Sequence, residues 1–375
     1  MEQPSGHPIL KSESDASEVH RGERVDTRLS LRTGGSSWSA ISSSETPFRK
    51  RHLVLEEVLG ENPMPIFGSI SIQGLADRME DTVVVQENFC DQPDIAGGKP
   101  LHFFAVYDGH GGSHVSTLCK NLMHQIIAEE LKNTWSTRGS KDDWADLVRA
   151  AIEKSFLRMD YVALNLCICG KKGPYCRYCC KPQEYAMVGS TAAVAILTPN
   201  RIVVANCGDS RAVLCRAGKP IPLSVDHKPD RPEELVRIKN AGGHIVYRDG
   251  FRVNGILDMS RSLGDLFLKT IITSKPSTSI TKRDPEDECL IIATDGIWDA
   301  ISNDLACQVV RTCLKEESPA TALRSPSSSH AMSGDDTNVL FPSKSAFAAT
   351  ILCRLALGRG STQNISAIVV DLMGH

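Results

Sequence analysis

Six acidic residues, scattered over 220 positions, lie where predicted strands end or in the turns beside them: Glu80, Asp81, Asp108, Asp209, Asp295 and Asp299. A set of ligands made only of carboxylate oxygens favours Mg²⁺ or Mn²⁺ over zinc or copper. His110 accompanies Asp108, and an imidazole can move protons near neutral pH.

These acids suit chemistry on a phosphate group. Carboxylates gathered in one place repel one another unless cations neutralise them. Two divalent ions ~3.5–4 Å apart would lower the pKa of a bridging water and hold a phosphate for in-line attack. Such a reaction needs no nucleophilic side chain, and the sequence contains neither G-x-S-x-G nor the phosphate-binding G-x-x-x-x-G-K-[ST].

Two apolar strands are predicted to deliver the central acids. LHFFAVYDGHGG (101–112) ends in Asp-Gly-His-Gly-Gly, and the run 289–293 leads into Thr-Asp-Gly. Glycines at such exits let the backbone approach a ligand closely. For the first segment alone, a hairpin with a capping Asp108 is the alternative, but a second strand with the same exit favours a shared site.

The remaining pattern predicts strands with antiparallel pairing and several helices. Turn signals recur about every ten residues between β-branched runs, which predicts strands over 67–74, 82–85, 191–197, 201–207, 211–216 and 365–372. Apolar residues at helical spacing, with caps and glycine stops, predict helices over 113–131, 143–166, 232–241, 302–314 and 346–357.

The composition is that of a globular protein with no strong electrostatic preference. The chain has 375 residues, 41% hydrophobic and 23% charged, with a formal net charge of −3. We therefore expect neither nucleic acid nor an anionic membrane as a partner. The first residues lack a signal-peptide pattern, so the 13 cysteines are interpreted as reduced thiols of a cytosolic or nuclear protein.

Three segments are expected to lie outside the regular core. Residues 1–62 are predicted to be disordered because they are polar and rich in Ser, Glu and Arg. Their basic cluster 49–52 is either a nuclear import signal or a solvated patch. The segment 316–345 is predicted to be a mobile loop. The third is the insertion 167–180, which offers four thiols for a structural zinc or is a surface segment of free thiols: Cys167, Cys169, Cys176 and Cys179.

The order of several motifs resembles that of the type-2C metal-dependent serine/threonine protein phosphatases, over residues 66–372. The motifs are RMED, VYDGHGG, GSTA, NCGDSRAVL, DHKPDRPEE, MSRSLGD, ATDGIWD and GSTQNIS. Their wording is most similar to plant clade A, the abscisic acid co-receptor phosphatases. The resemblance implies an α+β fold, a four-layer αββα sandwich of two antiparallel β-sheets flanked by helices, with the metals at one end.

The resemblance also assigns roles to individual residues. It implies two Mg²⁺ or Mn²⁺ ions, and a third held more loosely by Asp209 and Asp299. His110 would protonate the departing Ser or Thr oxygen. The ligands of the first two ions would be Glu80, Asp81, Asp108, the backbone carbonyl of Gly109 and Asp295.

Three positions depart from the family pattern. Gln363 stands where the family has Asp, and its amide oxygen would bind a metal without adding charge. Ala76 stands where the family has a phosphate-binding arginine, and Arg78 would share its face of an extended strand and replace it. Arg248 stands where clade A members have the tryptophan that contacts the receptor, which makes receptor binding doubtful.

These features predict an active protein serine/threonine phosphatase that regulates abscisic acid signalling negatively. Its expected partners are phosphorylated protein kinases and other phosphoproteins, and we expect a monomer in the nucleus and cytoplasm. One alternative is a weakly active, phosphatase-like binding module that inhibits kinases by docking, because Gln363 and Ala76 weaken the site. Another is a zinc-dependent interaction protein built on the cysteine insertion.

Overall fold

The structure is a computed structural model that describes residues 65–90, 93–139, 142–165, 187–315 and 343–373. Its main body contains two five-stranded sheets in which every neighbouring pair of strands is antiparallel. The first sheet has the order β1 (Phe67–Ile72), β15 (Ile365–Asp371), β14 (Asp287–Ala293), β8 (Arg211–Arg216), β9 (Lys219–Pro222). The second has the order β13 (Ser277–Lys282), β7 (Arg201–Cys207), β6 (Ala192–Leu197), β3 (His102–Tyr107), β2 (Thr82–Gln86).

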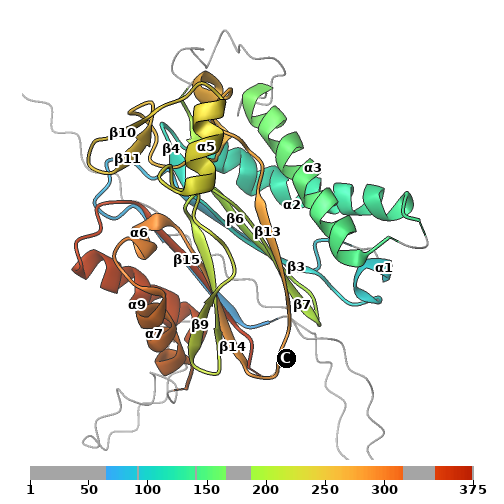
Figure 1. Cartoon of the computed structure of the whole chain (residues 1–375). Coiled ribbons are helices and arrows are strands. Elements are labelled where there is room, and N and C mark those ends of the chain that lie inside the picture. The colour runs from blue at the N-terminus through green and yellow to red at the C-terminus, as the bar shows by residue number, and fades with distance from the viewer. Residues whose placement is uncertain (1–64, 91–92, 140–141, 166–186, 316–342, 374–375) are drawn as a thin grey trace, which may run out of the picture. The chain divides into compact units, whose positions relative to one another are not determined.

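Helices cover the outer face of each sheet, so the molecule has four layers (Figure 1). The helices α2 (His114–Ser136) and α3 (Trp144–Asn165) share one apolar cluster with the second sheet. On the other side, α7 (Asn303–Lys315) and α9 (Lys344–Gly358) pack on the first sheet. A third cluster lies between the sheets. The predicted α+β sandwich of two antiparallel sheets flanked by helices is confirmed.

The central strand β3 shows why the sheets form where they do. All six of its residues are buried, because it lies between two neighbours and is covered on both faces. Phe103 contributes to the cluster under α2 and α3, and Phe104 to the cluster between the sheets. Replacing either ring by alanine would destabilise the fold by about 3–5 kcal/mol, the range for large cavities in a core. This rigid strand fixes the position of Asp108 at its end.

Shorter elements lie at the end of the sandwich where β3 finishes. The strands β4 (Gly109–His110), β5 (Gly189–Ser190) and β12 (Leu263–Gly264) form a small three-stranded sheet. The strands β10 (Ile245–Tyr247) and β11 (Phe251–Val253) form a hairpin. Further short elements are α5 (Pro232–Asn240), η1 (Leu266–Leu268) and α6 (Asp295–Trp298). The helix α1 (Pro93–Ala96) lies instead on the side where β3 begins (Figure 1).

The long predicted elements are confirmed, with corrections in irregular regions. The sequence pattern predicts a loop over residues 90–100, but this segment contains the helix α1, which begins at Pro93. The helix α9 begins at Lys344, where Ser343 accepts a hydrogen bond from the amide of Ala346. Residues 344 and 345 therefore belong to a capped helix and not to the mobile loop predicted for 316–345.

Several expectations concern residues outside the described ranges: the disordered segment 1–62, the zinc or thiol insertion 167–180 and the loop up to residue 342. They stay predictions. None of the eight cysteines that the structure describes forms a disulfide, and all eight are buried. Within the described ranges, no helix is both long enough and apolar enough to cross a membrane.

Candidate metal and phosphate site

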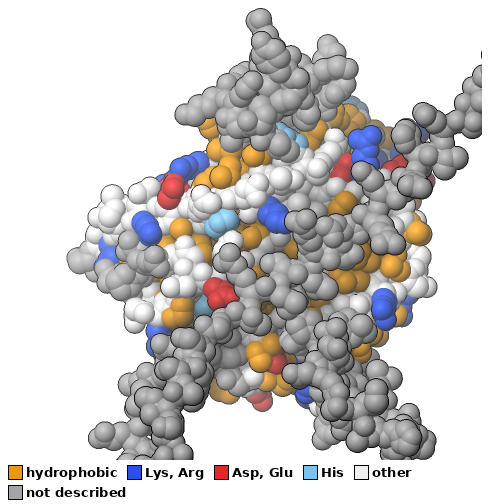
Figure 2. Space-filling model, turned by 180° about the vertical axis from the view of Figure 1, so that it is seen from behind, with side chains coloured by type: hydrophobic (Ala, Val, Ile, Leu, Met, Phe, Trp, Pro, Cys, Tyr) orange, Lys and Arg blue, Asp and Glu red, His pale blue; other side chains and the backbone are white. Residues whose placement is uncertain are grey.

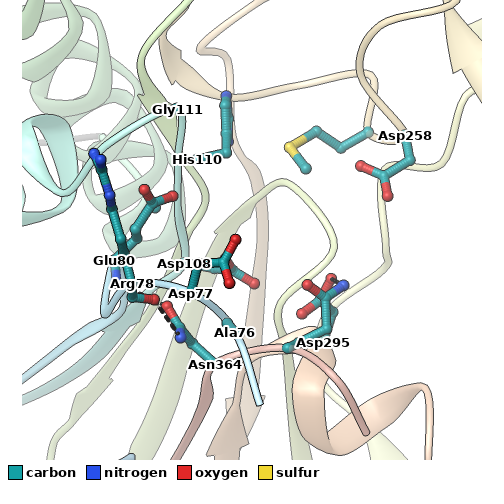
Figure 3. A pocket seen from close by; sticks show the side chains of 13 residues that line it. Ala76, Asp77, Arg78, Glu80, Asp108, His110, Gly111, Asp258, Asp295 and Asn364 are labelled. Carbon is teal, nitrogen blue, oxygen red and sulfur yellow. Dashed lines mark hydrogen bonds between the residues drawn. The ribbon is translucent and has the colours of Figure 1, made fainter. Parts of the chain in front are cut away.

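A cleft of about 610 Å³ lies at the end of the sandwich where β3 and β14 finish and where β2 and β15 begin. Antiparallel pairing places the end of one strand beside the start of the next, so these four corners meet. Seven residues predicted from the sequence line this cleft: Arg78, Glu80, Asp108, Gly109, His110, Asp295 and Gln363. In the view of Figure 3, Asp108 lies between Glu80 and Asp295, with His110 above it.

Asp108 and Asp295 lie near enough for their carboxyl groups to influence each other's pKa. Burial raises the pKa of Asp108 well above its ordinary value, and the neighbouring Asp295 and Asp81 raise it further. Burial and Asp209 likewise raise the pKa of Asp295. Carboxylates arranged in this way bind protons when no cation neutralises them.

Asp81 lies beneath the cleft, is 4% exposed and anchors the first sheet to the site. Its Oδ2 accepts hydrogen bonds from the hydroxyl groups of Thr294 (2.9 Å) and Ser366 (2.7 Å). Burial raises the pKa of Asp81 to about 6. Its Oδ1 is buried with no hydrogen-bond partner among the described residues, as is Oδ1 of Asp209. Buried oxygens without a partner are where an ion or a water is expected.

The residues present fit a pair of hard divalent cations. As the side chains stand, no group of three His, Cys, Asp or Glu residues in the described ranges is close enough together to hold a metal ion. The fit rests instead on the chemistry of the donors: carboxyl groups that repel one another line the cleft, and Oδ1 of Asp81 beneath it has no partner among the described residues. These oxygens outnumber the one thioether of the lining, that of Met259. Mg²⁺ or Mn²⁺ would be held by Glu80, Asp81, Asp108, the Gly109 carbonyl and Asp295.

Asn364, a residue for which the motifs predict no role, holds the loop that carries Glu80 and Asp81. Its Oδ1 accepts a hydrogen bond from the backbone amide of Glu80 (2.7 Å) and lies 3.4 Å from the amide nitrogen of Asp81. Its Nδ2 donates to the carbonyls of Gln73 (2.9 Å) and Arg78 (2.8 Å). One side chain at the start of β15 therefore fixes the whole turn between β1 and β2. The one feature of the sequence that could have indicated a role for Asn364 is its position directly after Gln363, a predicted metal ligand.

Gln363 lines the cleft as predicted, but its amide group faces a carboxylate. Its Nε2 donates a hydrogen bond to Oδ2 of Asp295 (3.0 Å). That contact offers the amide hydrogen, and not the amide oxygen, to the site. A metal at Asp295 would therefore compete with this hydrogen bond or require the amide to turn over.

The expectation that Ala76 and Arg78 share one face of an extended strand is wrong. Residues 74–78 form a turn, starting at Gly74 with φ +63°, and the strand β2 begins only at Thr82. Glu80 and Asp81 likewise precede the strand. Arg78 is exposed, lines the cleft together with Ala76, and reaches it because the turn is clamped by Asn364.

Asp209 and Asp299, predicted to serve a third ion, surround a lysine. The ammonium group of Lys228 donates to Oδ2 of Asp209, whose side chain is buried, and Asp299 lies near enough to interact with the same lysine. Burial alone would lower the pKa of Lys228, but Asp209 raises it well above its ordinary value. Neither acid lines the cleft. Lys228 belongs to the DHKPD motif, so that motif could have indicated a lysine near these acids.

His110 lines the cleft and is tied to Asp265, another residue without an assigned role. Its Nε2 lies 2.9 Å from both carboxylate oxygens of Asp265. Burial alone would lower the pKa of His110, but the carboxylate of Asp265 raises it above its ordinary value. The imidazole is thus held ready to carry a proton beside the acids.

Comparison with known proteins gives consistent results. A model of the family described as "Protein phosphatase 2C" matches residues 66–365. "Probable protein phosphatase 2C 75" of Arabidopsis thaliana is 46% identical over 89% of this chain and 78% of its own. "Probable protein phosphatase 2C 49" of Oryza sativa subsp. japonica is 44% identical over 84% of this chain and 79% of its own. The crystal structure of a serine-threonine phosphatase 2C from Toxoplasma gondii has a similar fold, with a TM-score of 0.58 at 19% identity, covering 81% of this chain and 94% of that one.

Proposed function

This chain belongs to the protein phosphatase 2C family of metal-dependent serine/threonine protein phosphatases, and we propose that it removes phosphate from phosphoserine and phosphothreonine at the cleft described above. The observation that carries the proposal is the meeting of Asp108 and Asp295 in one cleft with His110. Asp108 and Asp295 are far apart in the sequence, and only the fold brings their side chains together.

Several residues at the cleft have a part in hydrolysis. When bound, the two metal ions supply an activated water and neutralise the phosphate oxygens. Arg78, exposed at the rim, binds and orients the phosphate through its guanidinium group. The leaving Ser or Thr oxygen takes the electron pair of the broken P–O bond and a proton from His110. Asn364 keeps Glu80 and Asp81 in place through the turn that it clamps.

The test is release of phosphate from a phosphothreonine peptide during a Mn²⁺ titration, with wild-type protein and Asp108→Ala. We expect metal-dependent turnover that Asp108→Ala abolishes. A matched control is Asp287→Asn, which changes another buried aspartate, paired with Arg216 away from the cleft. No phosphate release by the wild type at millimolar Mn²⁺ would contradict the proposal.

A second candidate function is a phosphatase-like module that binds kinases and turns over slowly. Gln363 favours it, because its amide hydrogen bond to Asp295 occupies a carboxylate oxygen that a metal would need. Ala76 favours it too, since it offers no phosphate-binding group. Inhibition of a kinase by Asp108→Ala protein as strong as that by wild type, with negligible phosphate release from either, would support this function over hydrolysis.

We propose further that the protein acts as a negative regulator of abscisic acid signalling in the nucleus and cytoplasm of a plant, as a clade A enzyme with phosphorylated protein kinases among its substrates. Support comes from the plant relatives and from the similarity of the motifs to clade A. Dephosphorylation of hormone-activated kinases in plant extract would test it, and unchanged kinase phosphorylation would contradict it.

Weak or absent inhibition by hormone-bound receptors is proposed because Arg248 replaces the expected tryptophan. Arg248 is exposed in the turn of the β10–β11 hairpin, where its amide donates to the carbonyl of Gly250 (2.8 Å). A charged, flexible side chain there cannot fill a pocket shaped for indole. A phosphatase assay with receptor and hormone decides the matter, because full inhibition would overturn this proposal, whereas Arg248→Trp should increase sensitivity.

The proposed partners are phosphoproteins, with neither nucleic acid nor membrane among them, and the proposed state is a monomer. The net charge of −3 supports this, and on the face in Figure 2 the Lys and Arg side chains are scattered and not gathered into one basic patch. Light scattering of the purified chain and binding to labelled RNA or DNA are the direct measurements.

A further inference from the structure

The pairing of His110 with Asp265 joins two motifs that are 155 residues apart in the sequence. Both carboxylate oxygens of Asp265 lie 2.9 Å from Nε2 of His110. A carboxylate can only accept, so Nε2 carries a hydrogen and donates it between the two oxygens. Nδ1 is buried without a hydrogen-bond partner among the described residues. It is therefore the ring nitrogen that no described protein group occupies.

The carboxylate of Asp265 is itself held rigidly. Its side chain is fully buried, and its Oδ2 accepts a hydrogen bond from the hydroxyl group of Ser262. Its amide donates to the carbonyl of Val188 (3.0 Å). The residue has φ +52°, an uncommon left-handed conformation that aspartate adopts more readily than most other non-glycine residues.

The small sheet β4–β5–β12 brings the two residues together. In its register His110 pairs with Gly189, and Gly189 pairs with Gly264, the residue before Asp265. A Cβ atom on Gly189 would lie 2.2 Å from Oδ2 of Asp265 and 2.4 Å from Nε2 of His110. Only glycine at the central position therefore leaves room for the hydrogen bond between them.

We propose that Asp265 is a positioning residue for His110: it fixes the imidazole with Nε2–H toward the protein and Nδ1 toward the substrate. This rests on the proposed function of the cleft. In the step it supports, a water-derived oxygen forms the new bond to phosphorus. His110 enters this step as an imidazolium, with a hydrogen on each ring nitrogen. The broken P–O bond leaves its electron pair on the Ser or Thr oxygen, which takes the proton of Nδ1 and leaves a neutral imidazole with its hydrogen on Nε2. Asp265 stays ionised and keeps its hydrogen bond throughout.

The test compares two substrates that differ in their need for a proton donor. A phosphoserine peptide has an alkoxide leaving group, which needs a proton. The leaving group of p-nitrophenyl phosphate is the stable p-nitrophenolate, which does not. We expect Asp265→Asn to lower kcat on the peptide by at least ~10-fold, because a misplaced His110 loses part of the ~10²–10⁴-fold that a general acid contributes. KM for the peptide and kcat on p-nitrophenyl phosphate should each change by less than about threefold, since binding and attack are untouched.

A double-mutant cycle shows whether Asp265 acts through His110. If it does, His110→Gln combined with Asp265→Asn is no slower on the peptide than His110→Gln alone. The proposal would be overturned if the kcat losses of the two single variants multiplied in the double variant. It would also be overturned if Asp265→Asn lowered kcat equally on both substrates. Wild-type protein that is inactive on both substrates would instead contradict the proposed function.

Two further variants keep the test decisive if Asp265→Asn folds poorly. Ser262→Ala removes the hydrogen bond that holds Asp265 and leaves His110 in place, and we expect a smaller loss that is again confined to the peptide. Asp287→Asn changes another fully buried aspartate, whose partner is Arg216 at 2.6 Å. It should lower the melting temperature without altering the ratio of the two activities. If Ser262→Ala and Asp287→Asn changed the ratio of peptide activity to p-nitrophenyl phosphate activity equally, the proposal would be overturned.

Discussion

Two groups of buried acids in this molecule have opposite surroundings. Asp108 and Asp295 in the cleft lie near each other and near Asp81 beneath it, and burial raises the pKa of each of the three. At the start of α5, Glu234 is 1% exposed but contacts Arg237 and Arg261 and accepts a hydrogen bond from Ser260 (2.7 Å). Burial would raise the pKa of Glu234, but Arg261, Ser260 and Arg237 together lower it to about 2.

The difference separates acids that serve the fold from acids that serve the reaction. A carboxylate with guanidinium partners is neutralised by the protein itself. Carboxylates without such partners are left for a cation that the protein must bind, and they lower the stability of the metal-free fold. Lys228 makes Asp209 intermediate between the two groups, since it neutralises a buried acid beside the cleft.

The largest expected effect comes from Asp108→Asn, which removes one of the repelling charges. Phosphatase activity should fall on the order of 10³-fold, the scale for losing a group that stabilises developing charge. In the presence of a chelator, the same variant should be more stable than wild type by about 1 kcal/mol, since the repulsion is relieved. Urea unfolding measures the stability. If the metal-free variant were less stable than wild type, the acids at the cleft would not differ from Glu234 in the way described.

Glu234→Gln should have the opposite profile. Two arginines would lose their buried carboxylate, and we expect a loss of about 3 kcal/mol in the free energy of unfolding. Activity per folded molecule should stay within a few fold, because the residue does not line the cleft. Chemical denaturation and an assay at low temperature measure both quantities, and a stability equal to wild type would contradict the interpretation.

The two groups should also respond to pH in opposite directions in metal-free protein. The pKa of Glu234 is lowered from 4.5 to about 2, so its stabilisation is present above pH 4.5 and is lost as the pH falls toward 2. The pKa of Asp81 is raised from 3.8 to about 6, so its ionisation destabilises the fold as the pH rises from 3.8 through 6. Each contribution is on the order of 3 kcal/mol.

Unfolding curves between pH 3 and pH 8 with chelator test this. Asp81→Asn should remove the loss on the alkaline side, and Glu234→Gln the loss on the acid side. Identical pH profiles of the two variants would show that the two environments do not differ in the way described.

The smallest expected effect is on the affinity for metal. Gln363→Asp replaces an amide that donates to Asp295 by a carboxylate that can bind a cation. We expect the Kd for Mn²⁺ to fall about tenfold, equivalent to about 1.4 kcal/mol. Calorimetry measures the affinity directly, and an unchanged Kd would mean that the amide of Gln363 already turns its oxygen to the metal.

The sequence predicted the parts of this molecule that depend on local pattern. Runs such as 102–107 and 289–293 are apolar and β-branched enough to be strands in any sheet, and the acids after them were identified as a site. The strands β4, β5 and β12 could not be predicted, because two residues carry no periodicity. The strand β13 was missed because its alternation of Ser, Thr and Ile is weak.

The partners of the site residues were also beyond prediction. Asp265 and His110 are 155 positions apart, and nothing in either motif specifies the contact. The role of Asn364 depends on the turn at 74–78, which the sequence pattern had suggested to be extended. Such pairings are set by tertiary packing, so only a structure reveals them.

The position of β15 has a consequence for synthesis on the ribosome. This strand lies between β1 and β14 in the first sheet, and Asn364 at its start holds the turn that carries Glu80 and Asp81. A nascent chain therefore cannot complete that sheet, or the cleft, until residue 371 has left the exit tunnel. Until then β1 and β14 have unpaired edges. We expect chaperones that bind exposed strands to associate with this protein during late translation, and release to coincide with the emergence of β15.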